Sequence, residues 1–288
     1  MALELGAARD AAIVSADSRQ IYCYFNIGTA KPTREDCARA NHYGVDVAEP
    51  TERYSAARWA TEADEWIESA AEIEKAPVIV GGTGLYIKAL VEPLFEAPEI
   101  DPVQREQLER ELEKKSLGEL RQWCRTLDPA RAHLGRAQLT RAIETAVLTG
   151  MRISDLHAQH RASSPSPDDA DALYLVVDPD SALASRIEGR VDSMLKAGWL
   201  DEVRELVDKV PPEAPAWKAS GYRAMRDHIE GRFDLSSARQ RVIIETRQYA
   251  KRQRTWFRNQ LPEAAVTRVN PEDSRASAVV REWWERAE

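Results

Sequence analysis

Short apolar runs and segments of helical periodicity alternate in the first ninety residues of the chain. Residues 11–16 are apolar apart from Ser15 and are too few for a helix, and residues 76–80 form a second such run. Between them, apolar positions recur every three to four residues over residues 55–74, which predicts an amphipathic helix. A strand, a crossover helix and a second strand predict two parallel strands of one sheet.

The same patterns predict the organisation of the rest of the chain. Residues 1–9 have the pattern of the last turns of a helix, so the chain is expected to open inside an α/β unit. Residues 172–177 form a third predicted core strand. Residues 98–160 contain charged helical segments and no strand-like run, and the last third is predicted to be mainly helical. We therefore predict an α/β core, residues 1–97 and 161–288, with an inserted helical subdomain at 98–160.

Composition is typical of a folded globular protein. Hydrophobic residues make up 43% and charged residues 31% of the 288 positions, which are ordinary values. No stretch approaches the roughly 18 consecutive apolar residues that cross a bilayer, so we expect no membrane partner and a cytoplasmic location. The three scattered cysteines match neither a disulfide framework nor a zinc site.

The charge distribution matters more than the net charge. A formal net charge of −8 argues mildly against a nucleic-acid partner, because binding to a nucleic-acid backbone depends on Lys and Arg. Residues 239–258, however, gather Lys and Arg around the single acidic residue Glu245. This segment predicts a local basic surface.

Polar segments directly follow both predicted parallel strands, at the sheet edge where open α/β folds bind ligands. Asp17 follows the first strand and could act as a general base or help to hold a metal, although a turn or helix cap explains it equally well. Gly81-Gly82-Thr83-Gly84 follows the second. Glycines let backbone N–H groups approach an anion and Thr83 adds a hydroxyl donor, but an ordinary strand-to-helix turn explains the segment nearly as well.

A predicted helix near the C-terminus combines cations with aromatic residues. Its cations in residues 246–258 include Arg247, Lys251, Arg252 and Arg254. Guanidinium groups suit diphosphate and phosphodiester oxygens, and aromatic rings can stack on a base. The alternative is a solvated basic helix that docks through its aromatic side chains, which is the commoner origin of a charge run. Composition alone does not choose between them.

Five motifs, taken together and in order, resemble those of the bacterial tRNA dimethylallyltransferase family. They are DSRQIY at residues 17–22, IGTAKP at 27–32, VGGTGLY at 80–86, SGYR at 220–223 and AKRQRTWFR at 250–258. Their spacing matches too, and the resemblance covers nearly the whole chain. It implies an α/β fold with a P-loop NTPase-like parallel sheet flanked by helices, and a helical insertion that grips tRNA.

The resemblance implies a prenyl transfer. Enzymes of this family move a dimethylallyl group from dimethylallyl diphosphate to the exocyclic amine (N6) of the adenosine beside the anticodon, release diphosphate and use Mg²⁺. The implied partners are a tRNA anticodon stem-loop and dimethylallyl diphosphate, and we expect a monomer. Two alternatives stay open: a catalytically impaired RNA-binding remnant of the family, and an adenylate prenyltransferase, against which the insertion and the basic helix argue.

The resemblance also implies roles for individual residues. Asp17 would take the proton from the adenine amine, while Thr83 would act in catalysis and, with Arg247, hold the diphosphate. With Asp17, the base pocket would be lined by Ser18, Arg19 and Gln20. The other positions expected to contact tRNA are Arg105, Arg141, Lys218, Gly221, Tyr222, Arg223, Lys251, Arg252, Gln253, Thr255, Trp256 and Arg258.

One feature that the resemblance implies does not occur in the sequence. The family carries a G-x-x-x-x-G-K-[ST] loop just before its opening helix, and no such motif is found here. A P-loop supplies backbone donors, a Lys, and a Ser or Thr ligand for magnesium, so no magnesium ligand can be named. We therefore expect an N-terminal truncation that removes the first strand and the P-loop, and poor binding of prenyl diphosphate.

Overall fold

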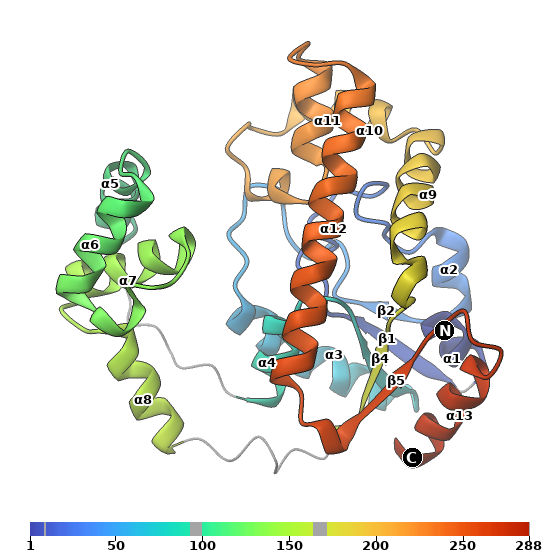
Figure 1. The fold of residues 1–288 in the computed structure, drawn as a ribbon. Helices are drawn as coiled ribbons and strands as arrows, with labels where there is room; N and C mark the ends of the chain where they lie inside the picture. The colour runs from blue at the N-terminus through green and yellow to red at the C-terminus, as the bar shows by residue number, and fades with distance from the viewer. Residues whose placement is uncertain (9, 93–99, 164–171, 288) are drawn as a thin grey trace. The chain divides into compact units, whose positions relative to one another are not determined.

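The computed structural model describes residues 1–8, 10–92, 100–163 and 172–287. The chain divides into two units, Met1–Val91 with Pro167–Glu288, and Glu92–Ser166 (Figure 1). The first contains every strand that the structure describes, and the second is helical. The boundaries that we predicted, at residues 98 and 160, lie close to those of the second unit.

The first part of the α/β unit contains a three-stranded parallel sheet of order β2-β1-β3. β1 (Ala11–Ser15) pairs with β3 (Ala76–Val80) along its whole length and, on its other side, with the short β2 (His42–Tyr43). Every residue of β1 is buried, as expected for a parallel strand covered on both faces. The two predicted strands and their parallel pairing are confirmed, whereas β2 is too short to give a periodic signal.

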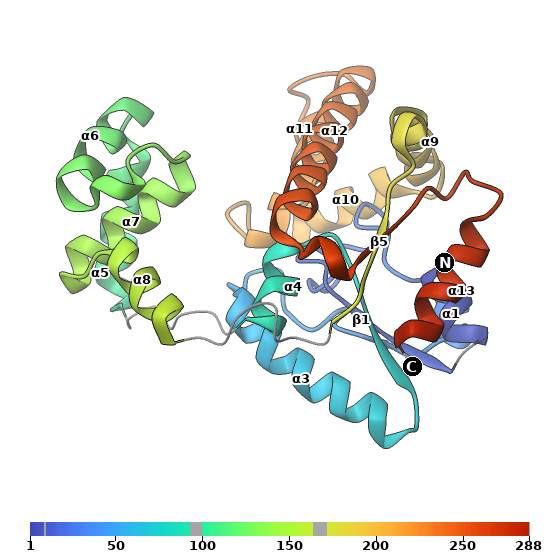
Figure 2. The same cartoon turned by 60° about the horizontal axis from the view of Figure 1, so that its bottom comes forward.

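Helices cover this sheet and cap its ends. They are α1 (Ala2–Ala8), α2 (Arg34–Arg39), α3 (Ala56–Glu72) and α4 (Gly84–Val91). The crossover α3 begins at Ser55, whose side chain accepts a hydrogen bond from Arg58 N, and Figure 2 shows it alongside the sheet. Trp59 of α3 is fully buried, and its Nε1 donates to Ser15 O at 3.0 Å. The amphipathic helix predicted between the strands is therefore confirmed.

β4 (Tyr174–Val177) and β5 (Val266–Val269) form a separate parallel pair. β4 falls within the predicted strand at 172–177, but its partner is β5 and not the three-stranded sheet. β5 was not predicted, because its four residues include Thr and Arg and show no apolar run. The final helix α13 (Ala276–Ala287) buries Trp283 and Trp284 near β5, as a terminal amphipathic helix should.

The C-terminal helices pack around α12 and make the larger core. They are α9 (Leu183–Lys196), α10 (Trp199–Lys209), α11 (Tyr222–Ile229) and α12 (Leu235–Gln260). α12 contacts α4, α9 and α11, so it joins the first sheet to the C-terminal helices. Short 3-10 turns in this unit are Asp180–Ala182, Pro215–Lys218 and Glu263–Ala265.

The second unit has a small core of its own. Its elements are α5 (Pro102–Glu113), α6 (Leu117–Leu127), the 3-10 turn Pro129–Arg131, α7 (Arg136–Thr149) and α8 (Ile153–Ser163). Leu112, Leu120 and Ile143 are buried together between α5, α6 and α7. No strand occurs in the described part of this unit, as predicted. Within the described residues of the whole chain, no helix has the length and apolar character of a membrane span.

Candidate active site

The turns that follow β1 and β3 are tied together by Thr83. Its Oγ1 accepts a hydrogen bond from Ser18 N at 3.0 Å and lies 3.3 Å from Ser18 Oγ, while Thr83 N donates to Ala16 O at 3.1 Å. The structure therefore brings the two polar segments together at the carboxyl ends of neighbouring parallel strands, where the fold class predicts a ligand site.

Asp17 lies between these tied residues and is partly buried. Its Oδ1 accepts a hydrogen bond from Arg19 N at 2.8 Å, which closes an Asx turn. Its second oxygen has no hydrogen-bond partner within the described part of the chain. One oxygen thus fixes the turn and the other is available to accept a proton, which is the geometry that a general base needs.

Helix α12 packs directly on the glycine turn after β3. Gln253 Nε2 donates to Gly82 O at 2.9 Å. A Cβ on Gly84 would lie 2.3 Å from the Trp256 ring, and a Cβ on Gly81 would lie 2.2 Å from Ala16 O. Close packing against α12 and Ala16 is therefore sufficient to require glycine at these positions. This supports the interpretation of the segment as an ordinary strand-to-helix turn, and it is also compatible with anion binding.

One side of α12 is held by ion pairs. Arg239 makes two hydrogen bonds to Asp192 of α9, at 2.6 and 2.9 Å, and this contact lowers the pKa of the Asp192 carboxyl. Arg247, expected at the diphosphate, pairs with Glu188 of α9. Arg254 pairs with Asp178, directly after β4. These ion pairs link α12 to α9 and to the segment after β4.

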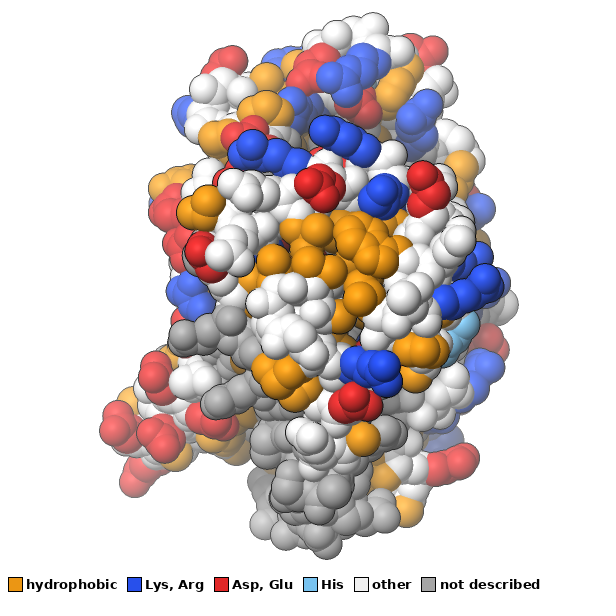
Figure 3. Space-filling model, turned by 90° about the vertical axis from the view of Figure 1, so that its left-hand side faces the viewer, with side chains coloured by type: hydrophobic (Ala, Val, Ile, Leu, Met, Phe, Trp, Pro, Cys, Tyr) orange, Lys and Arg blue, Asp and Glu red, His pale blue; other side chains and the backbone are white. Residues whose placement is uncertain are grey.

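The C-terminal half of α12 also borders an open groove and carries exposed cations. An open groove is lined by Gln248, Lys251, Arg252, Thr255, Trp256, Asn259 and Gln260. Lys251, Arg252 and Arg258 are exposed. Figure 3 shows one face of the molecule, on which basic and acidic side chains both lie around hydrophobic ones.

The segment expected to contact tRNA near residue 220 divides into exposed and buried residues. Lys218 and Arg223 are exposed. Tyr222 is fully buried, and Gly221 is buried with a φ of +85°, against Trp199. The resemblance implies that Gly221 and Tyr222 contact tRNA, but neither presents an exposed side chain. Both residues are buried in the packing around α11.

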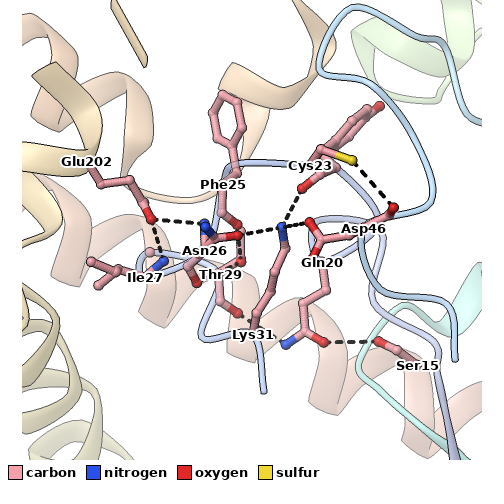
Figure 4. A network of polar contacts seen from close by, with 12 residues as sticks. Ser15, Gln20, Cys23, Phe25, Asn26, Ile27, Thr29, Lys31, Asp46 and Glu202 are labelled. Atoms are coloured by element: carbon pink, nitrogen blue, oxygen red, sulfur yellow. Dashed lines mark hydrogen bonds and ion pairs between the residues drawn. The ribbon is translucent and has the colours of Figure 1, made fainter. Parts of the chain in front are cut away.

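Gln20, expected to line a base pocket, uses its side chain within the protein. Its Oε1 accepts from Ser15 Oγ at 3.0 Å, and its Nε2 donates to Thr29 O at 3.2 Å and to Ala30 O at 3.0 Å (Figure 4). The side chain braces the loop at residues 17–32, hereafter the Asp17 loop. Ser18 and Arg19 are partly buried beside it.

In the helical unit, Arg105 and Arg141 lie in one electrostatic neighbourhood. Arg105 Nη2 is 3.4 Å from Oε2 of the buried Glu144. The pKa of Arg141 is lowered, first by burial of the guanidinium and then by the charges of Arg105 and Arg131. Arg131 was not singled out from the sequence, because nothing in its local pattern separates it from other surface arginines.

Glu202 is a further residue that the sequence analysis missed. It accepts hydrogen bonds from the Asp17 loop through Asn26 N and Ile27 N, at 3.1 and 2.8 Å. A signal was present, because Trp199, Val203 and Leu206 form the buried face of α10, and residue 202 falls on that face at helical spacing. A carboxylate in an apolar stripe indicates a specific partner.

The fit for a metal is limited. Within the described residues no group of three or more His, Cys, Asp or Glu side chains could hold an ion. Magnesium is commonly held by one or two carboxylates together with substrate phosphates. In the two turns that follow β1 and β3, the carboxylate is that of Asp17. These residues do not by themselves form a magnesium site.

Comparison with known proteins identifies the family. Residues 20–260 match the model of the IPP transferase family. The chain is 39% identical over 267 residues to the tRNA dimethylallyltransferase of Chelativorans sp. (strain BNC1), covering 91% of each protein. It is 34% identical to that of Cyanothece sp. (strain PCC 7425), covering 96% of this chain and 89% of the relative.

Solved structures agree. The tRNA delta(2)-isopentenylpyrophosphate transferase of Staphylococcus epidermidis has a TM-score of 0.65 at 28% identity, over 99% of this chain and 93% of the other. A eukaryotic dimethylallyltransferase, crystallised acting on tRNA, has a TM-score of 0.75 at 23% identity, over 96% of this chain and 73% of the other, and supports the fold alone. The predicted P-loop NTPase-like α/β fold is confirmed, and the chain belongs to the IPP transferase family.

Proposed function

We propose that this protein transfers a dimethylallyl group from dimethylallyl diphosphate to N6 of the adenosine beside a tRNA anticodon, with release of diphosphate. The observation that carries the proposal is the hydrogen bond from Ser18 N, next to Asp17, to Thr83 Oγ1 at the end of the parallel sheet, together with the open groove along α12. Relatives that match over most of this chain are named tRNA dimethylallyltransferase.

Asp17 would act as the general base. The adenine amine attacks the allylic carbon, the bond from that carbon to the diphosphate oxygen breaks with its electron pair, and the amine proton passes to the free oxygen of Asp17. An aromatic amine is a weak nucleophile, so stabilising the departing diphosphate contributes most to the rate. The bond of Asp17 Oδ1 to Arg19 N would hold the base in place during the transfer.

The diphosphate would be bound by Thr83 and Arg247. Arg247 pairs with Glu188, and both side chains are nearly half exposed, 44% and 46%; such a pair is worth little, so phosphate oxygens can replace Glu188. Mg²⁺, when bound, would neutralise charge on the diphosphate, and we assign it no protein ligand. The P-loop that the resemblance implies does not occur in the sequence, so this chain by itself is expected to bind diphosphate poorly.

The RNA would meet exposed cations on both units. On the α/β unit these are Lys218, Arg223, Lys251, Arg252 and Arg258, and on the helical unit Arg141. The partly buried Arg105, which pairs with Glu144, would contribute near Arg141. The target base has to leave its stack to reach Asp17, which costs roughly a few kcal/mol and less in a single-stranded loop. Transfer RNA as the substrate favours a cytoplasmic location, and we propose that the protein acts as a monomer.

The test uses two proteins, the 288-residue chain and a fusion in which the same chain is preceded by a strand and a G-x-x-x-x-G-K-[ST] loop of the kind that the resemblance implies. Each is incubated with labelled dimethylallyl diphosphate, Mg²⁺ and an anticodon stem-loop. We expect both to bind the RNA, the chain alone to show negligible turnover, and the fusion to label the stem-loop over many turnovers. Labelling by neither protein, despite RNA binding, would favour the RNA-binding remnant. Labelling of free AMP in preference to RNA would favour an adenylate prenyltransferase.

A further inference from the structure

Three successive backbone N–H groups of the Asp17 loop converge on two side chains of the C-terminal helices. Asn26 N and Ile27 N donate to Glu202 Oε2 at 3.1 and 2.8 Å (Figure 4). Gly28 N donates to the hydroxyl oxygen of Tyr222 at 3.0 Å, and that hydroxyl donates to Glu202 Oε1 at 2.5 Å. Successive N–H groups make a concavity that suits an anion, and here an internal carboxylate fills it.

We propose that Glu202, supported by Tyr222, is a positioning residue that orders the Asp17 loop and thereby holds Asp17 for proton transfer. The catalytic part of this proposal rests on the proposed function, in which Asp17 is the base. Its structural part, that Glu202 controls the order of the turn around Asp17, does not.

A chain of hydrogen bonds links the Glu202 contact to Asp17. The turn at residues 26–30 is tied to Gln20 through Thr29 O and Ala30 O, at 3.2 and 3.0 Å. Gln20 is tied in turn to Ser15, the last residue of β1, at 3.0 Å. The Asx turn of Asp17 lies between these two anchor points, so the position of the turn at 26–30 limits the freedom of Asp17.

Lys31 braces the same turn from inside the loop. Its side chain is only 4% exposed, and its Nζ donates to Tyr22 O at 2.5 Å and to Asn26 Oδ1 at 2.9 Å. Asp46 Oδ1 accepts its third hydrogen bond at 2.5 Å. Lys31 thus organises the loop internally, whereas Glu202 fixes the organised loop to α10.

The junction between the loop and the C-terminal helices has no room for adjustment. A Cβ on Gly28 would lie 2.3 Å from the ring of Trp199, which is itself fully buried. Burial, and then the charge of Glu202, raise the pKa of the Tyr222 hydroxyl, so it keeps its proton and remains a donor to the carboxylate. Loss of the carboxylate would therefore leave Ile27 N and the Tyr222 hydroxyl without their partner at a packed junction.

The test compares Glu202→Ala, Glu202→Gln and Tyr222→Phe. The matched control is Asp201→Ala, which removes a neighbouring carboxylate that is 76% exposed and pairs only with Arg204 among the described residues. The first measurement is amide hydrogen exchange at single-residue resolution on the 288-residue chain. For Glu202→Ala we expect exchange at Asn26, Ile27 and Gly28 to rise about tenfold or more.

The decisive amides are those of Ser18 and Arg19, which report on the Asp17 turn through their bonds to Thr83 and Asp17. We expect their exchange to rise in Glu202→Ala as well, to be largely restored in Glu202→Gln, which keeps an acceptor oxygen, and to match the wild type in Asp201→Ala. Tyr222→Phe should raise the exchange at Gly28 most. A rise confined to residues 26–28, or a uniform rise over the whole chain, would overturn the proposal, because Glu202 would then be a local or a global stabiliser.

The second measurement is single-turnover transfer by the same variants of the fusion protein, with RNA binding measured in parallel. We expect transfer by Glu202→Ala to fall about tenfold or more while RNA affinity stays within about twofold. If amide exchange at Ser18 and Arg19 rises in Glu202→Ala but the transfer rate does not change, the catalytic part of the proposal is wrong. Absence of transfer by the fusion protein without a substitution would count against the proposed function, while the exchange result on the 288-residue chain would still decide the structural part.

Discussion

Gln253 of α12 donates a hydrogen bond from Nε2 to the carbonyl oxygen of Gly82, at 2.9 Å. The same glycine turn is joined to the Asp17 loop through Thr83. The basic helix and the candidate base are therefore attached to one turn, although they lie more than two hundred residues apart in the sequence. A change in this turn should affect both the fold and the site.

Replacement of Gly81 by Ala should destabilise the protein. The added methyl would lie 2.2 Å from Ala16 O, and because this is hydrogen-bonded backbone directly after the central strand it cannot move aside cheaply. We expect a loss of about 1–3 kcal/mol in the free energy of unfolding, measured by urea denaturation. The control is Gly189→Ala in α9, where nothing lies within 4 Å and a gain of up to about 1 kcal/mol is expected. Equal stability of the two variants would refute the clash.

Replacement of Asp17 by Asn should separate catalysis from structure. Asn keeps the oxygen that accepts from Arg19 N but cannot take up a proton, so the turn should survive while transfer falls by roughly a hundredfold or more. Asp17→Ala should lose the transfer and also loosen the turn. Transfer rate and RNA affinity are measured for both variants in the fusion protein. Full transfer by Asp17→Asn would remove Asp17 as the base.

Elements with a strong local period were predictable from the sequence, and pairings between distant residues were not. β1, α3 and β3 follow from one apolar run, one amphipathic stretch and a second run, and the parallel rule then places Asp17 near Thr83. β5 has no such run, and it becomes a strand only because β4 lies beside it. Local pattern does not contain that information.

The division of the basic helix also depends on tertiary structure. Arg247 and Lys251 are both cations of α12, but Arg247 meets Glu188, which is 59 residues away in the sequence, whereas Lys251 faces an open groove. The burial of Tyr222 is hidden in the same way, since the Gly28 amide that it binds is 194 residues away. The resemblance located these residues, and the fold decided which of them are exposed.

The exposed cations of α12 should respond differently to removal than the ion-paired Arg239. Lys251→Ala or Arg258→Ala should weaken binding of the stem-loop and lower the slope of log affinity against log salt by about one each, as expected for loss of one phosphate contact. Arg239→Ala is the control. Its pair with Asp192 is partly exposed, so we expect a loss of stability below about 1 kcal/mol and unchanged RNA affinity. Filter binding over a range of salt concentrations checks this, and an equal salt effect of Arg239→Ala would contradict the separate roles given to the exposed and the ion-paired cations.

Alkaline pH should destabilise the protein, in part through Tyr222. Burial and the charge of Glu202 raise the pKa of Tyr222 above its ordinary value of 10.0. Above pH 10 the unfolded chain therefore releases a proton that the folded chain keeps, and the free energy of unfolding falls as pH rises. Below that range this contribution is complete.

Tyr222→Phe should be less stable than wild type at pH 8, because Glu202 and Gly28 N lose a partner. Its stability should nevertheless fall less steeply between about pH 10 and 11. Urea denaturation at a series of pH values measures both slopes, and identical slopes would show that Tyr222 titrates alike in the folded and unfolded chains.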